Sequence, residues 1–326
     1  MLALVTGGHG FVGSHLCARL LEEGHRVRVL ARPSSSLANL AGLDVDVVRA
    51  DVTEPGGLPA AVAGCDVVFH LAGALKGLRE TDLFRVNADG TRNLAAACAA
   101  AAPRPSRFLY VSSLAAAGPS VGGATPRTEQ MTPQPLTWYG RSKLAAEDAV
   151  RSTAGLVWTI VRPSIVFGPR DRDVLEYFRI ARRGWLPVVG FADRHYSLVY
   201  AADLADALVR AAAAPASAGE IYFLAGPEVV RWVELGRLIA AALGTRGRVV
   251  RIPDLAAVAA GWGADVLARA RHQAHIFSSQ KVLEMLAPAW VCSADKAARD
   301  FGWRASTPLP DALAATASWY RNHGWL

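Results

Sequence analysis

The sequence predicts an α/β protein built on a doubly wound parallel sheet of the Rossmann type, with a smaller, mostly C-terminal α/β lobe. Two observations predict this class. Short apolar runs alternate with helical patterns over the first half of the chain, and this alternation is typical of a parallel sheet with helices on both faces. The runs are also nearly continuous in apolar residues, as expected for strands that are covered on both faces.

The elements follow in a regular order up to about residue 168. Strands are expected at Leu2–Thr6, Arg26–Ala31, Val45–Arg49, Val67–Leu71, Phe108–Ser112 and Thr159–Arg162. Helices are expected near 12–23, 57–63, 81–101 and 138–151. The rhythm then changes: 168–190 is predicted as a loop, a helix and a second loop, "ADLADALVRAAAA" as a helix, and "EIYFLAG" as a strand.

A glycine-rich turn follows the first strand in "VTGGHGFVGSHL". Gly7 suits a tight turn, Gly10 allows the backbone to approach a pyrophosphate, and Gly13 allows close packing of helix and strand. The helix that begins near Phe11 and Val12 offers free N–H groups and a partial positive charge to phosphates. We therefore expect a dinucleotide-binding domain over 1–167 and a mainly substrate-binding lobe over 168–326, with 196–225 returning to the first domain.

The end of the second strand indicates which dinucleotide is bound. An acidic residue here would favour NAD by binding the adenine ribose, but the sequence continues "ARPSSS". Arg32 can hold a 2′-phosphate, assisted by hydroxyls such as that of Ser35, so NADP is favoured and NAD is the alternative. Asp51, followed by Val52, is a candidate partner for the adenine edge. Small residues after the fourth strand leave room for the cofactor, at Leu71, Ala72 and Gly73.

Composition limits the classes of partner. The chain has 326 residues, a net charge of +7 and only four lysines, and no basic run is dense enough to predict nucleic-acid binding. Its four cysteines show no metal-ligand spacing, so no metal is expected. We expect the cysteines to be buried free thiols in a reducing cytoplasm. The N-terminus does not read as a signal peptide, and no apolar stretch is long enough for a transmembrane helix.

Three polar residues are expected to meet at the sheet edge. Ser112 and Ser113 end the fifth strand, and Tyr139 and Lys143 lie about one turn apart on the next helix. A neighbouring ammonium favours the phenolate and lowers the pKa of a tyrosine, which can then exchange a proton with a substrate hydroxyl or carbonyl. A serine hydroxyl can hold the same substrate oxygen while a nicotinamide carries the hydride.

With these motifs in place, the chain resembles an extended short-chain dehydrogenase/reductase of the NAD-dependent epimerase/dehydratase family. The matching pieces are "TGGHGFVG", "ADV", "HLAG", "NADGTRNL", "VSS", "YGRSK" and "RPSIVFGP", and "YSLVYAADLADAL" resembles a further family element. The resemblance implies that Ser113, Tyr139 and Lys143 form a catalytic triad. It also implies that Asn87 and the backbone at Pro163, Ile165 and Val166 line the cofactor pocket, and that the protein dimerises through the helices near 81–101 and 138–151.

Departures from the family patterns reduce the number of reaction types that the sequence favours. Ser113 is followed by leucine and alanines, where family dehydratases place acidic residues. Ser164 stands near the place where sugar-nucleotide enzymes have an asparagine, and Ser197 and Leu198 stand near the place of an Arg–Asp pair. The arginines of 170–194 could still hold phosphates. We therefore favour an oxidoreductase that interconverts a secondary alcohol and a ketone, with an apolar substrate as in the hydroxysteroid dehydrogenase and flavonol reductase-like members. The alternatives are a sugar-nucleotide epimerase and, outside catalysis, a dinucleotide-sensing regulator.

One stretch, residues 252–277, is unusual because its first half is small and apolar and its second half is basic. It is expected to pack in the core or a dimer interface, with a wall of the substrate crevice or a membrane surface as alternatives. His272 and His275 are expected on a helix surface and not as metal ligands, since no carboxylate or cysteine accompanies them.

Overall fold

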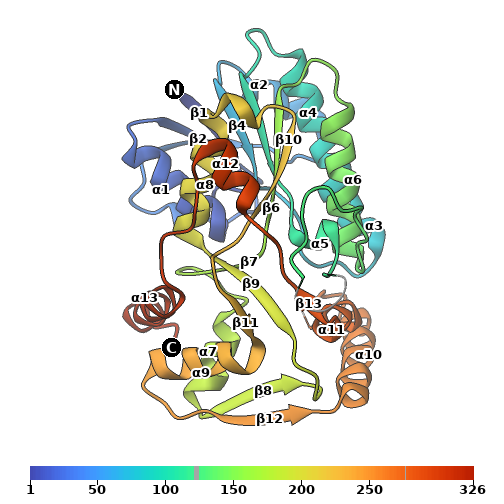
Figure 1. Ribbon diagram of the computed structural model, residues 1–326. Helices are drawn as coiled ribbons and strands as arrows, with labels where there is room; N and C mark the ends of the chain where they lie inside the picture. Colours follow the sequence, from blue (N-terminus) through green and yellow to red (C-terminus); the bar gives the residue numbers. More distant parts are fainter. Residues whose placement is uncertain (121–124, 276) are drawn as a thin grey trace.

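A seven-stranded parallel sheet forms the centre of the larger domain (Figure 1). The structure, a computed structural model, describes residues 1–120, 125–275 and 277–326. The strands lie in the order β10-β6-β5-β4-β1-β2-β3, and every neighbouring pair is parallel. Their bounds are β1 (Leu2–Thr6), β2 (Arg26–Ala31), β3 (Val45–Arg49), β4 (Val67–His70), β5 (Arg107–Val111), β6 (Trp158–Pro163) and β10 (Glu220–Leu224). The predicted fold class is confirmed.

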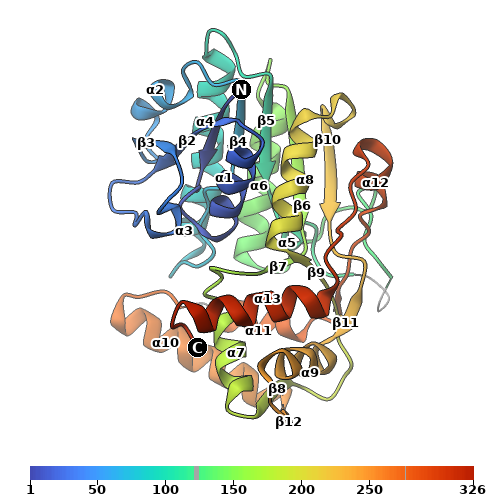
Figure 2. The same cartoon turned by 90° about the vertical axis from the view of Figure 1, so that its left-hand side faces the viewer.

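Helices cover both faces of this sheet (Figure 2). One layer contains α1 (Phe11–Glu22), α8 (Ala201–Ala213) and α12 (Asp295–Phe301), and the other contains α2 (Leu58–Val62), α4 (Gly90–Ala100) and α6 (Trp138–Ser152). Each layer has its own apolar core, with Leu16 and Leu208 fully buried in the first and Leu94 and Val150 in the second. Each such leucine contributes about 1.5–3 kcal/mol when it is buried.

The helix predicted over 81–101 is interrupted. It consists of α3 (Glu80–Phe84), a π-helical turn at Arg85–Asp89 and then α4. The turn contains Asn87, whose side chain is buried. Single π turns inside helices frequently mark functional sites, and this one lies beside the predicted cofactor pocket.

The smaller lobe combines two short sheets with five helices. The strands are β7 (Ile165–Phe167), β8 (Trp185–Val189), β9 (His195–Tyr200), β11 (Val229–Arg231), β12 (Arg248–Ile252) and β13 (Ala289–Trp290). The helices are α7 (Leu175–Arg182), α9 (Trp232–Leu243), α10 (Asp254–Arg271), α11 (Ser279–Leu286) and α13 (Leu309–Asn322). The second loop predicted within 168–190 is wrong: β8 occupies it, because this segment pairs with the distant β12.

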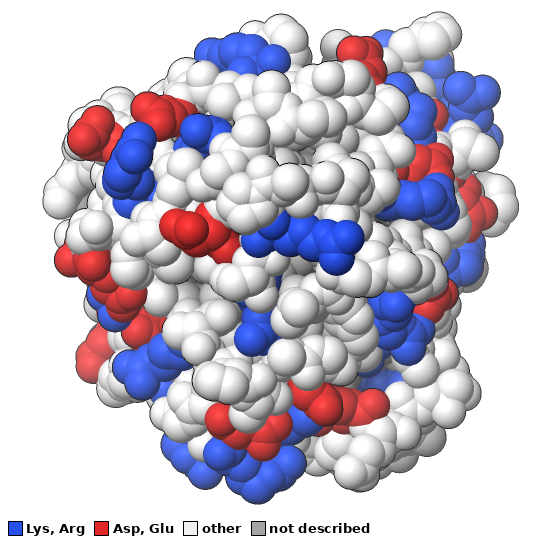
Figure 3. All heavy atoms as spheres, turned by 90° about the horizontal axis from the view of Figure 1, so that it is seen from above, with Lys and Arg blue, Asp and Glu red and all other residues white. Residues whose placement is uncertain are grey.

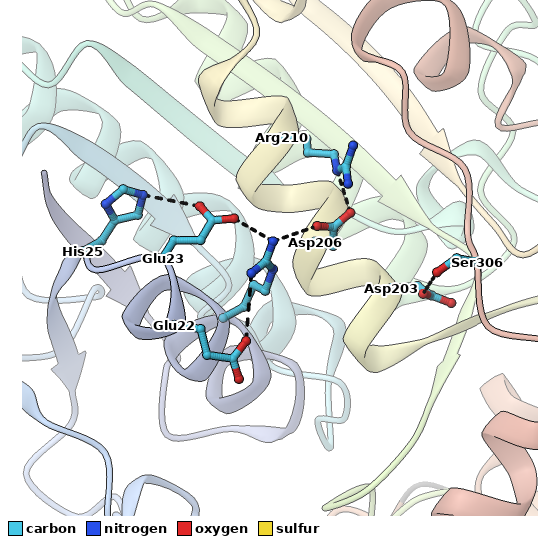
Figure 4. A network of polar contacts seen from close by, with 8 residues as sticks. Glu22, Glu23, His25, Asp203, Asp206, Arg210 and Ser306 are labelled. Carbon is cyan, nitrogen blue, oxygen red and sulfur yellow. Dashed lines mark hydrogen bonds and ion pairs between the residues drawn. The ribbon is translucent and has the colours of Figure 1, made fainter.

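The segment 196–225 divides between the two parts of the molecule. Helix α8 packs against α1, and β10 extends the large sheet beside β6, whereas β9 pairs with β7, β11 and β13 in the smaller lobe. Figure 4 shows two polar contacts of α8: Asp206 accepts from Arg210, and Asp203 accepts from Ser306 of the C-terminal segment. Asp206 also lies 3.2 Å from Arg19 of α1.

Charges of both signs are interspersed on the upper face of the molecule (Figure 3). Most exposed ion pairs join residues three or four positions apart on one helix, such as Arg92 with Asp89 and Arg151 with Asp148. Pairs of this kind contribute little to stability. In the described part of the chain no helix has the length and hydropathy to cross a membrane.

Candidate functional site

The candidate site lies at the carboxyl ends of the parallel strands, where β1 and β4 are neighbours. The strand order reverses at this point, and ligands of open α/β sheets bind in the crevice there. Gly7 has a φ of +71°, and a Cβ atom on it would lie 2.8 Å from the backbone nitrogen of Ala72. The glycine therefore allows the turn after β1 to contact the Leu71–Gly73 segment after β4.

The start of α1 fits a pyrophosphate. A Cβ atom on Gly13 would lie 2.2 Å from the carbonyl oxygen of Gly7, so any larger residue would push the turn away from the helix. Gly10 is the N-cap residue and supplies no side-chain hydrogen bond. The N–H groups of the first turn, which includes Phe11 and Val12, therefore remain available to an anion.

A basic corner forms beyond β2 and β3. Arg32 is exposed at the end of β2, and the Arg49 guanidinium donates to the carbonyl oxygens of Arg32 and Ser35 at 2.9 and 3.1 Å. The Ser35 hydroxyl is buried without a partner among the described residues. Burial and the nearby guanidinium groups of Arg32 and Arg49 lower the pKa of His9. This corner combines positive potential with an unused hydroxyl, which suits a phosphate group.

Asp51 and Val52 lie after β3 in a local turn. One carboxylate oxygen of Asp51 accepts from the backbone nitrogen and the hydroxyl of Thr53, both at 2.9 Å. Val52 is buried, and a Cβ atom on Gly90 would lie 2.7 Å from its side chain. Thr53 therefore fixes the Asp51 side chain at the edge of the crevice, beside the end of β3.

Asn87 positions the loop after β4. Its amide oxygen accepts from the Ala74 nitrogen at 2.7 Å, and its amide nitrogen donates to the Ala74 carbonyl at 2.9 Å and to the Ser142 hydroxyl at 2.8 Å. A Cβ atom on Gly73 would lie 3.1 Å from the Asn87 amide oxygen. Asn87 thus joins the Leu71–Gly73 segment to α6, on which Tyr139 and Lys143 lie.

The far side of the crevice is formed where β6 passes into β7. Pro163 ends β6 and is buried, while Ile165 and Val166 begin β7 and are half-buried. Between them, the backbone nitrogen of Ser164 donates to Leu224 at 2.9 Å, and the Ser164 hydroxyl is buried without a partner among the described residues. This segment offers mainly apolar side chains and backbone groups.

Ser113 and Tyr139 meet across the crevice. Thr137 caps α6 by accepting from the Gly140 nitrogen at 3.2 Å, so Tyr139 falls in the first turn of the helix. The Ser113 hydroxyl accepts from the Ala115 nitrogen at 3.1 Å and lies near enough to the Tyr139 phenol to affect its pKa. The contact with Ser113 lowers the pKa of Tyr139, but burial outweighs it and raises that pKa to about 12.

Lys143 is buried one turn further along α6. Its ammonium donates to the carbonyl of Val111 at 2.7 Å and lies 4.4 Å from the centroid of the Tyr110 ring. Burial lowers the pKa of Lys143 to about 7. In the chain without a bound cofactor, burial therefore outweighs any lowering of the Tyr139 pKa by Lys143. Desolvation dominates at both residues, and the phenol is neutral at pH 7.

A buried ion pair lies directly behind this pair of residues. Glu147 follows Lys143 by one further turn and accepts from Arg162 of β6 through both carboxylate oxygens, at 2.9 and 2.6 Å. Ser112 also donates to Glu147, at 2.5 Å. Ser112 therefore joins β5 to α6 inside the protein, whereas Ser113 faces the crevice. The Glu147 carboxylate raises the pKa of Lys143 against the effect of burial.

The smaller lobe closes the site beside Tyr139. The backbone nitrogen of Trp138 donates to the Gln280 side chain at 3.0 Å, and Thr137 contacts Glu284 at 3.4 Å. A groove opens here between the larger domain and α10. Its apolar lining comes from Leu78, Trp138, Ala268 and Phe277.

The arginines of 170–194 do not gather into one phosphate site. Arg179 pairs with Glu176, and Arg194 is buried beside Asp254. Arg170 lies against α1, 3.4 Å from a ring nitrogen of His15. His272 and His275 are exposed, as the sequence predicts, but neither lies on a helix: His272 is the C-cap of α10 and His275 follows it. The four cysteines are buried and free, which confirms that expectation.

These features together define a nucleotide-binding α/β protein of the oxidoreductase or epimerase class. The model of the NAD dependent epimerase/dehydratase family matches residues 3–225, and the chain belongs to that family. It is 33% identical over 323 residues to the ceramide reductase of Caulobacter vibrioides, covering 99% of this chain and 95% of that protein. It is 29% identical to the 2-alkyl-3-oxoalkanoate reductase of Shewanella oneidensis, covering 95% of this chain and 84% of that protein.

Among solved structures, the fold is similar to that of the dTDP-glucose 4,6-dehydratase DesIV from Streptomyces venezuelae. The TM-score is 0.81 at 24% identity, covering 100% of this chain and 98% of that chain. At this identity the similarity concerns the fold.

Sequence reasoning missed three residues around the site. Arg49 and His9 complete the basic corner, and Glu147 balances the charge of Lys143. Arg49 is the last residue of β3 and His9 follows β1, so the rule that the crevice lies at the carboxyl ends of the strands would have found them. Glu147 continues the one-turn spacing of Tyr139 and Lys143.

Proposed function

We propose that this protein is an NADP-dependent reductase that converts an apolar ketone to a secondary alcohol. The observation that carries the proposal is the close approach of the Ser113 hydroxyl, at the carboxyl end of β5, to a neutral Tyr139 phenol. A neutral phenol with a pKa of about 12 is a proton donor at pH 7. Such a donor can protonate a carbonyl oxygen as the carbonyl carbon is reduced.

In this proposal Ser113 and Tyr139 both donate hydrogen bonds to the substrate carbonyl oxygen. Tyr139 then transfers its proton to that oxygen as negative charge develops on it. Lys143, with a pKa of about 7, holds the cofactor ribose and stabilises the phenolate that remains. The nicotinamide, when bound, supplies the hydride for the carbonyl carbon.

The residues of the crevice fit a dinucleotide, and we assign its parts to them. Gly7, Gly10 and Gly13 with the first turn of α1 hold the pyrophosphate. Asp51 and Val52 hold the adenine end, and the segments Leu71–Gly73 and Pro163–Val166 enclose the nicotinamide end. Arg32, Ser35 and Arg49 bind a 2′-phosphate, which is why we favour NADP over NAD.

For the substrate, we propose an amphiphilic ketone with a long apolar part. The two relatives named above are, by their names, reductases of a ceramide and of a 2-alkyl-3-oxoalkanoate, which are both amphiphiles. The groove beside Trp138 suits the same class, because its lining combines apolar residues such as Leu78 and Phe277 with polar ones such as Asp265 and Gln280. We further propose a homodimer formed through α3, α4 and α6, and a cytoplasmic location, which the four free thiols support.

Tyr139→Phe tests the proton transfer. This variant removes the donor but keeps the ring, so the rate of NADPH oxidation with a 2-alkyl-3-ketoacid should fall about 10²–10⁴-fold, while NADPH affinity stays within a factor of two or so. Tyr177→Phe is the matched control, because the hydroxyl of Tyr177 is buried without a partner among the described residues and lies on α7 of the smaller lobe. Full activity of Tyr139→Phe would end the proposal.

Arg32→Ala tests the cofactor. Losing a charge-assisted contact should weaken NADPH binding about 10- to 100-fold and leave NADH binding unchanged, as measured by quenching of protein fluorescence. Arg304→Ala, which removes a guanidinium from a side chain that is 76% exposed, should change neither affinity. Equal losses for NADPH and NADH with Arg32→Ala would reverse the assignment in favour of NAD.

A further inference from the structure

Helix α10 presents large apolar side chains to solvent, where a surface helix normally presents polar ones. Its buried residues are small, namely Ala257, Gly261 and Ala268. Its large apolar side chains point outward: Leu255 is 81% exposed, and Trp262 and Val266 are each 65% exposed. These three follow one another at spacings of seven and four residues and therefore form a single stripe along the helix.

The rest of the outward face is also without charge over most of its length. Leu267 is exposed beside the stripe, and the remaining exposed positions are mainly alanine and glycine: Ala256, Ala259, Ala260, Gly263 and Ala270. A helix that is apolar on all sides is normally buried. Figures 1 and 2 show α10 instead at the outer edge of the smaller lobe, next to α11. A contiguous exposed apolar surface of this kind marks an interaction site.

Arginines lie near both ends of the apolar stripe. Arg269 and Arg271 lie in the last turn, and among the described residues neither has an acidic partner. At the other end, Phe191 is 71% exposed with the exposed Arg251 guanidinium 5.8 Å from its ring centroid.

The neighbouring carboxylates are occupied within the protein. Asp254 lies 3.4 Å from Arg194, Asp193 lies 3.5 Å from Arg231, and Asp265 accepts from the Ser279 nitrogen at 3.2 Å. The cations around the apolar stripe are therefore the charges that remain for an external partner.

The apolar surface adjoins the groove at Trp138, the residue before Tyr139. The groove beside Tyr139 is lined on one side by Ala268 and Arg269 of α10 and by Phe277, which is 42% exposed, and on the other by Leu78 and Trp138. The stripe and the groove therefore share α10, and the groove adds polar lining from Asp265 and Gln280 to its apolar residues. A second copy of the chain seated on α10 would cover this groove.

We propose that α10 and Phe277 dock on the surface of an anionic lipid bilayer, with the apolar stripe in the interface and the arginines against the headgroups. An exposed apolar stripe with arginines at its ends can bury its side chains at the headgroup boundary, and basic residues near an anionic surface add to the attraction. The lipid substrate class rests on the proposed function. If both hold, ketones enter the groove directly from the bilayer. Docking itself requires only the surface of α10.

Vesicle flotation tests the docking. The full-length protein should float with vesicles made of equal parts phosphatidylglycerol and phosphatidylcholine, and less with phosphatidylcholine alone. The triple variant Leu255→Ser, Trp262→Ser, Val266→Ser should lose more than about tenfold of this binding, and Arg269→Gln and Arg271→Gln about fivefold each. The control variant Val157→Ser, Val229→Ser changes exposed apolar residues away from α10, 44% and 42% exposed, and should float like the unmodified protein.

Two further measurements separate the explanations. Brominated lipids should quench tryptophan fluorescence in the unmodified protein and much less in Trp262→Phe, which keeps an apolar ring. The triple variant should reduce a short, water-soluble ketone normally but a vesicle-borne long-chain ketone poorly. Tyr139→Phe should float normally, so failure of the proposed chemistry and failure of docking are distinguishable. No flotation of the unmodified protein, with a dimer that the triple variant dissociates in light scattering, would overturn the proposal in favour of a second copy.

Discussion

At the scale of the residue, burial governs the two ionisable groups of the candidate site. Tyr139 has its pKa raised to about 12 and Lys143 has its pKa lowered to about 7, and in both cases desolvation is the main cause. Both shifts favour the neutral form. In the chain by itself, burial therefore favours the uncharged phenol of Tyr139 and the uncharged amine of Lys143. A bound group that changes the local charge would shift both equilibria.

Lys143→Met tests the buried amine through the pH dependence of stability. The pKa of Lys143 falls from 10.5 to about 7 on folding, so between these pH values the unfolded chain binds more protons and stability rises with pH. Below pH 7 the buried Lys143 is charged in the folded protein, and the desolvation of its ammonium lowers the free energy of unfolding by its full amount. Methionine removes this cost, so the gain in free energy of unfolding over the unmodified protein should be larger at pH 6 than at pH 9. Urea titrations measure it, and an equal difference at the two pH values would show an unshifted pKa.

At the scale of the element, the site depends on how α6 is fixed to the sheet. Glu147 joins α6 to Arg162 of β6 and to Ser112 of β5, and all three side chains are buried. Thr137 fixes the start of the same helix. The cap thus fixes the position of the start of α6, and the buried ion pair fixes the position of its middle. Tyr139 and Lys143 lie between these two points.

Glu147→Gln should strongly destabilise the fold. The substitution leaves the Arg162 guanidinium buried without a counter-charge, and breaking a buried pair costs about 3–5 kcal/mol. Glu176→Gln is the control, since Glu176 pairs with Arg179 on an exposed helix face and should change stability by less than about 1 kcal/mol. The free energy of unfolding in urea distinguishes the two, and similar small losses for both variants would contradict a central role for the buried pair.

At the scale of the whole molecule, the C-terminal segment joins the two parts. Helix α12 packs on the larger domain, and α13 packs on the smaller lobe, where the Tyr320 hydroxyl donates to the Asp171 carbonyl at 2.6 Å. Between them, Asp203 of α8 accepts from the Ser306 hydroxyl and from the nitrogen and hydroxyl of Thr307. One buried carboxylate therefore fixes the crossing segment.

Asp203→Ala should loosen this connection. Three hydrogen bonds to a charged group are lost, which should lower the free energy of unfolding by about 1.5–3 kcal/mol and speed proteolysis near residue 306. Asp206→Ala, on the same helix (Figure 4) but in a partly exposed ion-pair network, should cost about 1 kcal/mol or less. Unchanged proteolysis of Asp203→Ala would show that α12 and α13 hold the segment without this carboxylate.

The sequence by itself determined the larger domain and the strand ends at which the site forms. Apolar runs, the glycine turn and the one-turn spacing of Tyr139 and Lys143 are local patterns, and backbone geometry converts such patterns directly into strands, turns and helix faces. Only the tertiary structure decided the rest. Strand β8 forms because of a partner more than 60 residues away, and both pKa shifts come from burial. The outward face of α10 was also invisible in the sequence, because an apolar helix gives no sign of which side its neighbours cover.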